Sequence, residues 1–217
     1  MPSRILSNTL LALFLTLATL GARAGGESLI KPIQDEWAQV KYRVAEKQQA
    51  ERYHDLALRA RKLAESHPGS AEILIWEGIV LSSEAGARGG LGALSLAKDA
   101  KRRFEEAMKL DDKALKGSAY TSLGSLYYKV PGWPIGFGDK DRAESLLKKA
   151  LALHPDGIDP LYFYADFLNE RERYAEAQRF LEAALKAPAR PGRELADGGR
   201  RQEVQALLAS VRKNLEN

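Results

Sequence analysis

Apolar residues recur along most of the chain at intervals of three and four, and turn-forming residues separate the runs. This spacing gathers them on one face of an α-helix, and no segment keeps the period-two alternation of a β-strand. We therefore predict an all-α protein. The expected helices cover about 29–50, 53–66, 71–85, 94–110, 114–129, 140–153, 160–171, 174–186 and 200–215.

Several of these boundaries have local physical reasons. Asp139 and Asp159 have side chains that accept hydrogen bonds at a helix start, and Pro160 suits the first helical position after Asp159. The third expected helix, 71–85, is apolar on nearly every side, so we expect neighbours on both of its flanks. The last helix is apolar on one side only, which suits a cap over the helices before it.

Small residues recur at matching positions in alternate helices, with spacings of four and three. The last alanines of these sets are 43 residues apart (107 to 150) and then 34 apart (150 to 184). One helical pair cannot bury its apolar face alone, so successive pairs are expected to stack. The three sets are Ala100, Phe104 and Ala107; Ala143, Leu147 and Ala150; and Ala177, Leu181 and Ala184.

A 34-residue helical pair with small residues where helices touch resembles the tetratricopeptide repeat family. The resemblance covers about residues 34–189, although two earlier copies need about seven and ten extra residues. The degenerate copies also place Arg61 and Glu77 where the family has apolar residues. The family implies a right-handed superhelical solenoid, here of about four hairpins over 25–189, followed by a linker and capping helix over 190–217.

The extra residues fall near 86–94 and 130–139, each between the two helices of a hairpin. Both insertions should emerge on the same edge of the solenoid, where they would form one lobe that narrows the groove. The first is rich in glycine and is expected to be a flexible connection. The second contains Trp133, Ile135 and Phe137, which either pack down over the edge of the stack or project as a binding patch.

The family resemblance also identifies candidate binding residues on the concave face. In tetratricopeptide proteins the first helix of each pair lines the groove, and this mixture of aromatic and uncharged polar residues suits an extended peptide or a small hydrophobic ligand. With Trp133 and Phe137 from the loop, the candidates are Tyr42, Ile75, Ile79, Tyr128, Tyr162, Asp166 and Asn169, beside Thr121 and Ser125.

Residues 1–24 have the pattern of a secretory signal peptide. Arg4 precedes an apolar stretch that reaches Leu20, and small residues before Ala24 suit cleavage after that residue. The apolar stretch is interrupted and short for a membrane span, so we expect no stable membrane insertion after cleavage. These features predict a periplasmic protein. The absence of cysteine excludes disulfides and a cysteine-linked lipid anchor.

The charged residues do not indicate nucleic acid or catalysis. The chain has 33 Lys and Arg against 29 Asp and Glu, interspersed without a basic stripe, which argues against a nucleic-acid partner. A small basic patch over 190–201, on the edge opposite the insertions, is expected to be solvated, with contact to an anion as the less favoured alternative. The three histidines lack metal-ligand spacing and no nucleophile motif is present, so we predict no enzyme, no cofactor and no metal site.

These observations favour a non-enzymatic periplasmic scaffold that binds a protein or peptide through its concave face and its aromatic loop. The alternative is a ligand-binding accessory component of a periplasmic transport system. It is motivated by a weaker resemblance to the helical-repeat T-component of tripartite periplasmic transporters. An open groove would favour the scaffold, and a pocket closed by the two loops would favour the accessory component.

Overall fold

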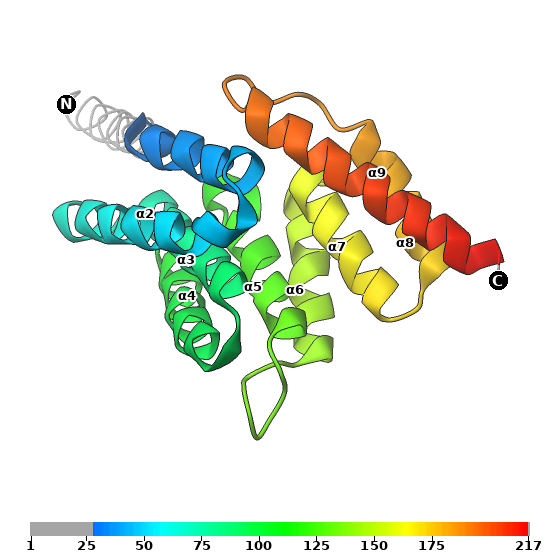
Figure 1. The fold of residues 1–217 in the computed structure, drawn as a ribbon, viewed down its shortest axis with the longest axis horizontal. Helices are drawn as coiled ribbons and strands as arrows, with labels where there is room; N and C mark the ends of the chain where they lie inside the picture. The colour runs from blue at the N-terminus through cyan, green and yellow to red at the C-terminus, as the bar shows by residue number, and fades with distance from the viewer. Residues whose placement is uncertain (1–27, 217) are drawn as a thin grey trace, which may run out of the picture.

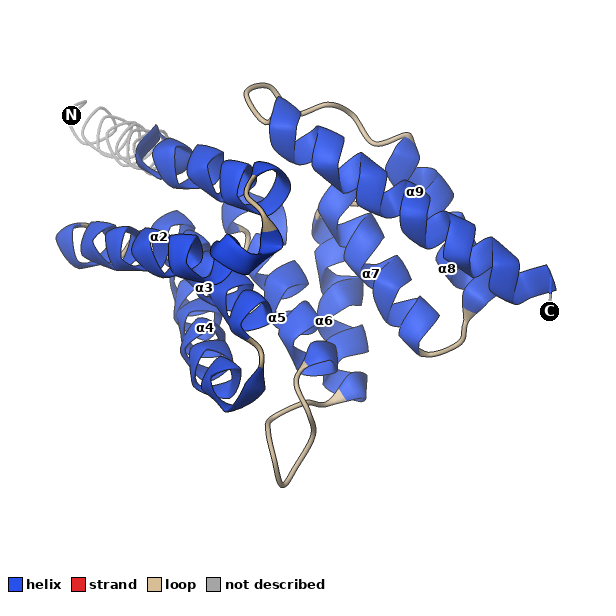
Figure 2. Ribbon diagram, viewed as in Figure 1, coloured by secondary structure: helices blue, strands red, loops and turns tan. Residues whose placement is uncertain are grey.

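The computed structural model describes residues 28–216 of the 217-residue chain, apart from the side chain of Leu91. The predicted signal peptide, 1–24, lies outside these residues. Within the described part, the regular elements are helices and no strand is present, which confirms the all-α prediction (Figure 2). Residues 28–43 are helical and are followed by α2 (Glu46–Ser66), α3 (Ala71–Arg88), α4 (Gly90–Leu110), η1 (Ala114–Gly117), α5 (Ser118–Lys129), α6 (Lys140–Leu153), α7 (Ile158–Glu170), α8 (Tyr174–Leu185) and α9 (Glu194–Glu216).

Successive helices form pairs that stack in a curved row, as a helical repeat requires (Figure 1). The pairs are α3 with α4, α5 with α6, and α7 with α8, preceded by helix 28–43 with α2. The row bends so far that its first helix and α9 come together at the top of the view. The core is one continuous cluster of buried side chains that runs through all the pairs.

Glycine and alanine occupy the closest helix contacts, as the repeat pattern predicts. A Cβ atom on Gly78 would lie 2.6 Å from the Phe104 ring, and one on Gly124 would lie 2.8 Å from Leu147. Both glycines therefore allow the two helices of a pair to approach more closely than alanine would.

The structure supports one of the two predicted aspartate caps. The Asp139 side chain accepts a hydrogen bond from the backbone N–H of Arg142 at 3.0 Å, so it caps α6 as predicted. The prediction for Asp159 is wrong, because α7 begins at Ile158, two residues before the predicted start at Pro160, and Gly157 precedes it. The Asp159 carboxylate instead pairs with arginines from the C-terminal part of the chain.

The first two helices divide earlier than predicted. The first ends at residue 43 instead of about 50, and α2 begins at Glu46. The side-chain amide of Gln49 donates to the carbonyl oxygen of Val44 at 3.0 Å, which stabilises this turn. Sequence periodicity did not reveal the break, because the residues on both sides of it have high helix propensity.

The predicted insertion at 86–94 is not a loop. Helix α3 continues to Arg88 and α4 begins at Gly90, with Gly89 between them. Gly89 and Gly90 both have a φ of 63°, a left-handed conformation that favours glycine, so they make the turn alone. The extra residues lengthen both helices, and the predicted two-loop lobe does not form.

Helix α9 begins at Glu194, earlier than the predicted start near residue 200, and includes Gly198 and Gly199. A Cβ atom on Gly199 would lie 2.3 Å from the ring of Tyr42, so glycine is needed for the contact with helix 28–43. Helix α9 also packs on α8 and α7, as a capping helix would. Among the described residues, no helix has the length and apolar character to cross a membrane.

Candidate binding cavity and projecting loop

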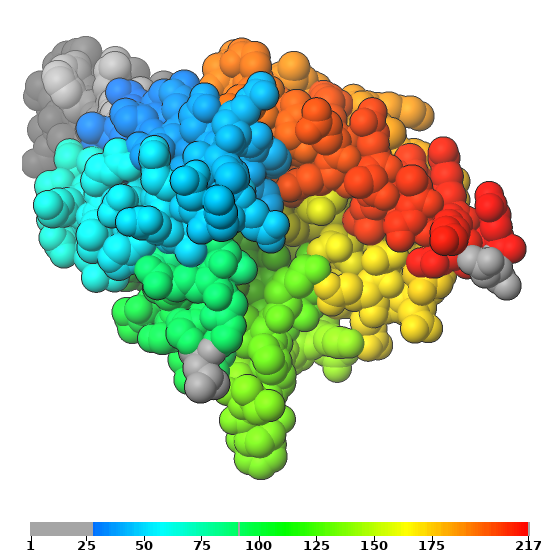
Figure 3. Space-filling model, viewed as in Figure 1, coloured from blue at the N-terminus to red at the C-terminus, as the bar shows by residue number. Residues whose placement is uncertain are grey.

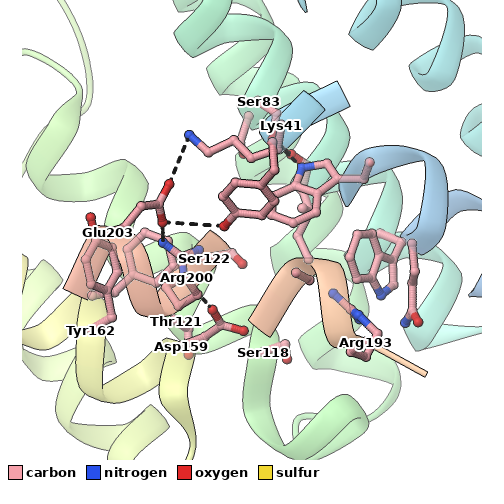
Figure 4. Close-up of a pocket in the computed structure, with 18 of the residues that line it drawn as sticks. Lys41, Ser83, Ser118, Thr121, Ser122, Asp159, Tyr162, Arg193, Arg200 and Glu203 are labelled. Carbon is pink, nitrogen blue, oxygen red and sulfur yellow. Dashed lines mark hydrogen bonds and ion pairs between the residues drawn. The ribbon is translucent and has the colours of Figure 1, made fainter. Parts of the chain in front are cut away.

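Helix α9 closes the concave face of the row of helices. The Tyr42 hydroxyl donates to the Glu203 carboxylate at 3.5 Å, and the Lys41 ammonium lies 3.4 Å from the same group. Both contacts join helix 28–43 to α9 across the open side of the arc (Figure 4). The concave face is therefore a partly enclosed cavity instead of a continuous groove.

This cavity has a volume of about 970 Å³. Its walls come from helix 28–43, α2, α3, η1, α5 and α7, and α9 with the segment before it forms the remaining side. Aromatic side chains, hydroxyl groups and charged groups all line it (Figure 4). A cavity of this size and mixed lining is typical of a site for a small ligand or a few residues of a peptide.

A buried ion-pair network holds α9 against α7. Arg200 is 6% exposed; its Nε atom donates to Asp159 Oδ1 at 2.9 Å, and its guanidinium also pairs with Glu203. Arg190 donates to Asp159 Oδ2 at 2.7 Å. Although burial opposes ionisation, Arg200 and Arg190 hold the pKa of Asp159 well below its usual range.

The prediction of a solvated basic patch over 190–201 is wrong. Arg190 and Arg200 are bound to Asp159, and Arg201 donates to the carbonyl oxygens of Leu185 and Ala187 at 2.7 Å each, at the end of α8. The acidic partner lies 31 and 41 residues before Arg190 and Arg200. A pattern search for adjacent opposite charges does not detect pairs at that separation.

Four of the predicted groove residues line the cavity. These residues come from three different helices, and the structure brings them together around one cavity. They are Tyr42, Ile79, Tyr162 and Asp166, accompanied by Thr121.

Three other predicted groove residues do not line this cavity. Ile75 belongs to the core and is fully buried, and Asn169 is half-buried outside the cavity wall. Tyr128 is buried, and its hydroxyl donates to Asp166 at 2.7 Å. Burial, reinforced by the Asp166 charge, raises the pKa of Tyr128. Lys129 completes an ion pair with Asp166 at 2.8 Å, so this carboxylate already has two partners in the protein.

In the loop 130–139, some apolar side chains project and another packs down, so each of the two interpretations that the sequence left open holds for part of the loop. Trp133 is 90% exposed and Ile135 is 67% exposed, so both project. Phe137 packs down, with its ring edge-to-face on Tyr127 at 5.5 Å between centroids. The loop forms the protrusion below α5 and α6 in Figure 3.

Backbone contacts hold this loop in a fixed hairpin-like shape. The N–H of Gly138 donates to the carbonyl of Pro131 at 2.9 Å, and the N–H of Asp139 donates to the carbonyl of Tyr127 at 2.9 Å. A Cβ atom on Gly138 would lie 2.0 Å from the Val130 carbonyl oxygen, so glycine is required there. Trp133 is therefore presented from an ordered loop.

The described residues offer no group of three or more His, Cys, Asp or Glu side chains that could hold a metal ion. The histidines have other partners. His54 lies 3.0 Å from the buried Glu84 carboxylate, and His154 lies 3.6 Å from Asp156.

Comparison with known proteins identifies the repeat. Residues 135–211, which include all of α6, α7 and α8 and most of α9, match the sequence model of a tetratricopeptide repeat family. This stretch of the chain is therefore similar to tetratricopeptide repeats. Such repeats typically bind protein partners. None of the curated proteins matches the sequence significantly.

Two solved structures are similar to this chain at low sequence identity. The crystal structure of MamA is 18% identical, with a TM-score of 0.45, over 78% of this chain and 92% of that one. A structure from the functional characterisation of Pseudomonas aeruginosa pilF is 16% identical, with a TM-score of 0.36, over 83% of this chain and 89% of that one.

The charged departures from the tetratricopeptide pattern contact one another. Glu77 of α3 is fully buried, and its carboxylate lies 3.6 Å from Arg61 Nε of α2 and 3.0 Å from Arg103 Nε of α4. The two residues that break the apolar pattern of the first copies therefore form parts of one buried charge cluster. The sequence showed each departure but not their pairing.

Proposed function

We propose that this tetratricopeptide repeat protein is a non-enzymatic scaffold that binds a protein partner through the loop 130–139. The observation that carries the proposal is Trp133, which is 90% exposed at the end of a loop fixed by backbone hydrogen bonds. An exposed tryptophan beside an exposed Ile135 is unfavourable in water unless a partner covers it. The repeat fold agrees with a scaffold, since proteins of this family generally serve that role.

The geometry of the loop suits insertion into an apolar pocket of the partner. Tryptophan is enriched among the residues that dominate binding energy at protein interfaces, because it buries a large area with few rotatable bonds. The loop is already ordered by the contacts of Phe137 and Gly138, so binding loses little conformational entropy. We place this interaction in the periplasm, on the basis of the signal pattern in residues 1–24.

Trp133→Ala tests the proposal. In crosslinking and pull-down from a periplasmic extract, we expect the variant to lose the specific partner, with an affinity drop of about 30-fold or more for the purified pair. Its melting temperature should stay close to that of the original protein, because an exposed side chain contributes little to folding.

Leu110→Ala is a matched control, because Leu110 is a 50% exposed apolar residue on α4 away from this loop. It should retain the partner. If Trp133→Ala keeps the same partners and melts several degrees lower, the loop is a structural element and the proposal is wrong.

A ligand-binding accessory role in periplasmic transport is a second candidate, and the closure of the concave face favours it. The cavity of about 970 Å³ falls at the upper end of the range typical of small-molecule sites. Helix α9 closes it, instead of the two loops that the sequence led us to expect. Binding of a small apolar molecule to the purified protein, measured by titration calorimetry, tests this role.

A further inference from the structure

Arg193 differs from the other arginines around the cavity. Arg190 and Arg200 both pair with Asp159. The guanidinium of Arg193 forms no ion pair or side-chain hydrogen bond within the described residues, and it lies over the Trp76 ring at 5.0 Å from the centroid. Its positive charge therefore stands on the cavity wall without a directly paired carboxylate in the described part of the chain, although Asp159, Asp197 and Asp35 lie near enough to favour its charged form.

The surroundings of Arg193 make this unpaired charge unfavourable. The side chain is half-buried, and burial together with the neighbouring Arg190 lowers the pKa of Arg193. A cation that has lost part of its hydration and faces a like charge gains from a nearby anion. Figure 4 shows the Arg193 side chain beside the start of α9, on the side of the cavity away from Arg200 and Glu203.

Other groups on the same cavity wall also favour negative charge. Lys116 lines the cavity and makes no ion pair among residues 28–216. His154 lines it too, and its pKa is lowered by burial and by the charges of Lys116 and Arg190. Carboxylates such as Asp159 partly offset these charges, but seven Lys and Arg residues line the cavity against four Asp and Glu residues. The balance favours a positive potential in the cavity.

The hydroxyl groups of α5 add hydrogen-bonding capacity beside these cations. Ser118, Thr121 and Ser122 from the first two turns of this helix line the cavity. Lys116 precedes them in a left-handed conformation, with a φ of 55°, followed by Gly117 at 79°. This backbone path brings the positively polarised start of α5 to the cavity wall, which adds to the potential set by the side chains.

The walls beside these positively charged groups are apolar. Trp76 and Ile79 of α3, together with Tyr162 and Phe163 of α7, give the cavity apolar and aromatic surface. A ligand that matches both parts has an anionic end and an apolar body.

We propose that the cavity binds an organic carboxylate, with its anionic end at Arg193 and its apolar body against Trp76 and Ile79. The proposal deepens the ligand-binding candidate and does not depend on the loop 130–139. The carboxylate belongs either to a free carboxylic acid or to the C-terminus of a peptide, since both present the same group. A guanidinium donates paired N–H bonds to such a group, and charged hydrogen bonds are stronger than neutral ones.

Titration calorimetry with two matched pairs of compounds tests the proposal. The first pair is 4-phenylbutyrate and 4-phenylbutyramide, and the second is N-acetyl-alanyl-phenylalanine with a free or an amidated C-terminus. In at least one pair, the carboxylate should bind about 10-fold more tightly than its amide, and added salt should reduce the difference. A preference in the first pair only identifies free acids, and one in the second pair only identifies peptide ends.

Variants of Arg193 test whether its side chain causes the preference for a carboxylate over an amide. Arg193→Gln should abolish the difference between carboxylate and amide while leaving amide binding unchanged, and Arg193→Lys should keep part of it. Arg102→Gln is the control, because Arg102 is 66% exposed on α4 and pairs only with Asp99. Circular dichroism melting curves show whether each variant is folded. If Arg193→Gln is not folded, the carboxylate preference of Arg193→Lys is compared with that of the original protein instead.

Three outcomes overturn the proposal. If acid and amide bind equally, or Arg193→Gln keeps the preference, the cavity binds ligands without an anion site, and only the further inference fails. If none of the four compounds binds, the ligand-binding candidate fails with it.

Discussion

The first two helical pairs and the last pair bury different chemistry at comparable helix contacts. In α7 and α8 the contact is made by small and branched apolar residues, and Ala165, Leu181 and Ala184 are fully buried there. Between α2, α3 and α4 the equally buried Glu77 lies between Arg61 and Arg103. The same fold is thus built with apolar packing at one end and with a buried charge cluster near the other.

The difference shows that a charged residue can replace an apolar one inside a repeat if the neighbouring helices supply residues of opposite charge. Burial raises the pKa of Glu77 above its ordinary value, and the two arginines only partly oppose this effect. The carboxylate therefore gains less from its partners than it loses by leaving water, as is common for buried ion pairs. We infer that the cluster fixes how α2, α3 and α4 fit together more than it adds to stability.

Leu181→Ala probes the apolar end and should have the largest effect. Leu181 is fully buried in α8, so the variant loses the transfer free energy of the side chain and leaves a cavity. We expect the free energy of unfolding, from urea titration, to fall by about 3–4 kcal/mol. Leu58→Ala, at a 45% exposed position of α2, should change it by less than about 0.5 kcal/mol. Equal losses in the two variants would contradict the packing described for α8.

Arg103→Leu probes the charged end. It removes the closer partner of a buried carboxylate and should lower the free energy of unfolding by about 3 kcal/mol. Adding Glu77→Leu should restore most of this loss, because an apolar pair replaces the charged pair. Urea titration of the single and double variants measures the coupling. A double variant as unstable as Arg103→Leu would show that the charge cluster itself provides the stability.

Two carboxylates near the ends of the row should also respond to pH with opposite signs: Glu77 of α3, and Glu144 of α6, which contacts Arg173 just before α8. Arg173 and Lys148 lower the pKa of Glu144 to about 2, so its contribution is present above pH 4.5 and is lost as the pH falls toward 2. Glu77 has a raised pKa, so its contribution is present below pH 4.5 and is lost as the pH rises through the folded value.

Urea titrations of Glu144→Gln and Glu77→Gln between pH 2 and 8 measure these contributions. Partial exposure of Glu144 limits its effect to about 1 kcal/mol or less. The stability lost in Glu144→Gln should therefore shrink as the pH falls, whereas that in Glu77→Gln should shrink as the pH rises. Parallel pH profiles for the two variants would remove this distinction between the ends.

Much of the fold could be predicted because the repeat is encoded locally. Spacings of three and four gave the helices, and Asp139 marked the start of α6 by a hydrogen bond within its own first turn. The errors arose where a distant contact decided the outcome. Gly199 would end an isolated helix, but in α9 it receives the ring of Tyr42. The glycines after Arg88 were read as a loop, whereas two of them in left-handed conformations were sufficient for a turn.

The cavity was less predictable than the fold. The family resemblance placed Tyr42 and Tyr162 on the concave side, because the position of a residue in the repeat determines the direction of its side chain. It gave no indication that α9 would cross that side. The one-sided apolar pattern of α9 shows that one face is buried but not which helices cover it. The sequence placed Arg193 in a basic patch on the opposite edge, whereas it lines the cavity, because its position depends on the path of the chain before α9.

The contact between Tyr42 and Glu203 joins residues 161 positions apart. An open row of repeats has two free ends and unravels from either of them, one unit at a time. In this protein, release of the first helix would also uncover Gly199 and separate Lys41 from Glu203. The ends are therefore expected to resist fraying and to exchange their amide hydrogens as slowly as the middle of the row. Folding requires a long chain closure before this contact forms, and unfolding becomes a single cooperative event.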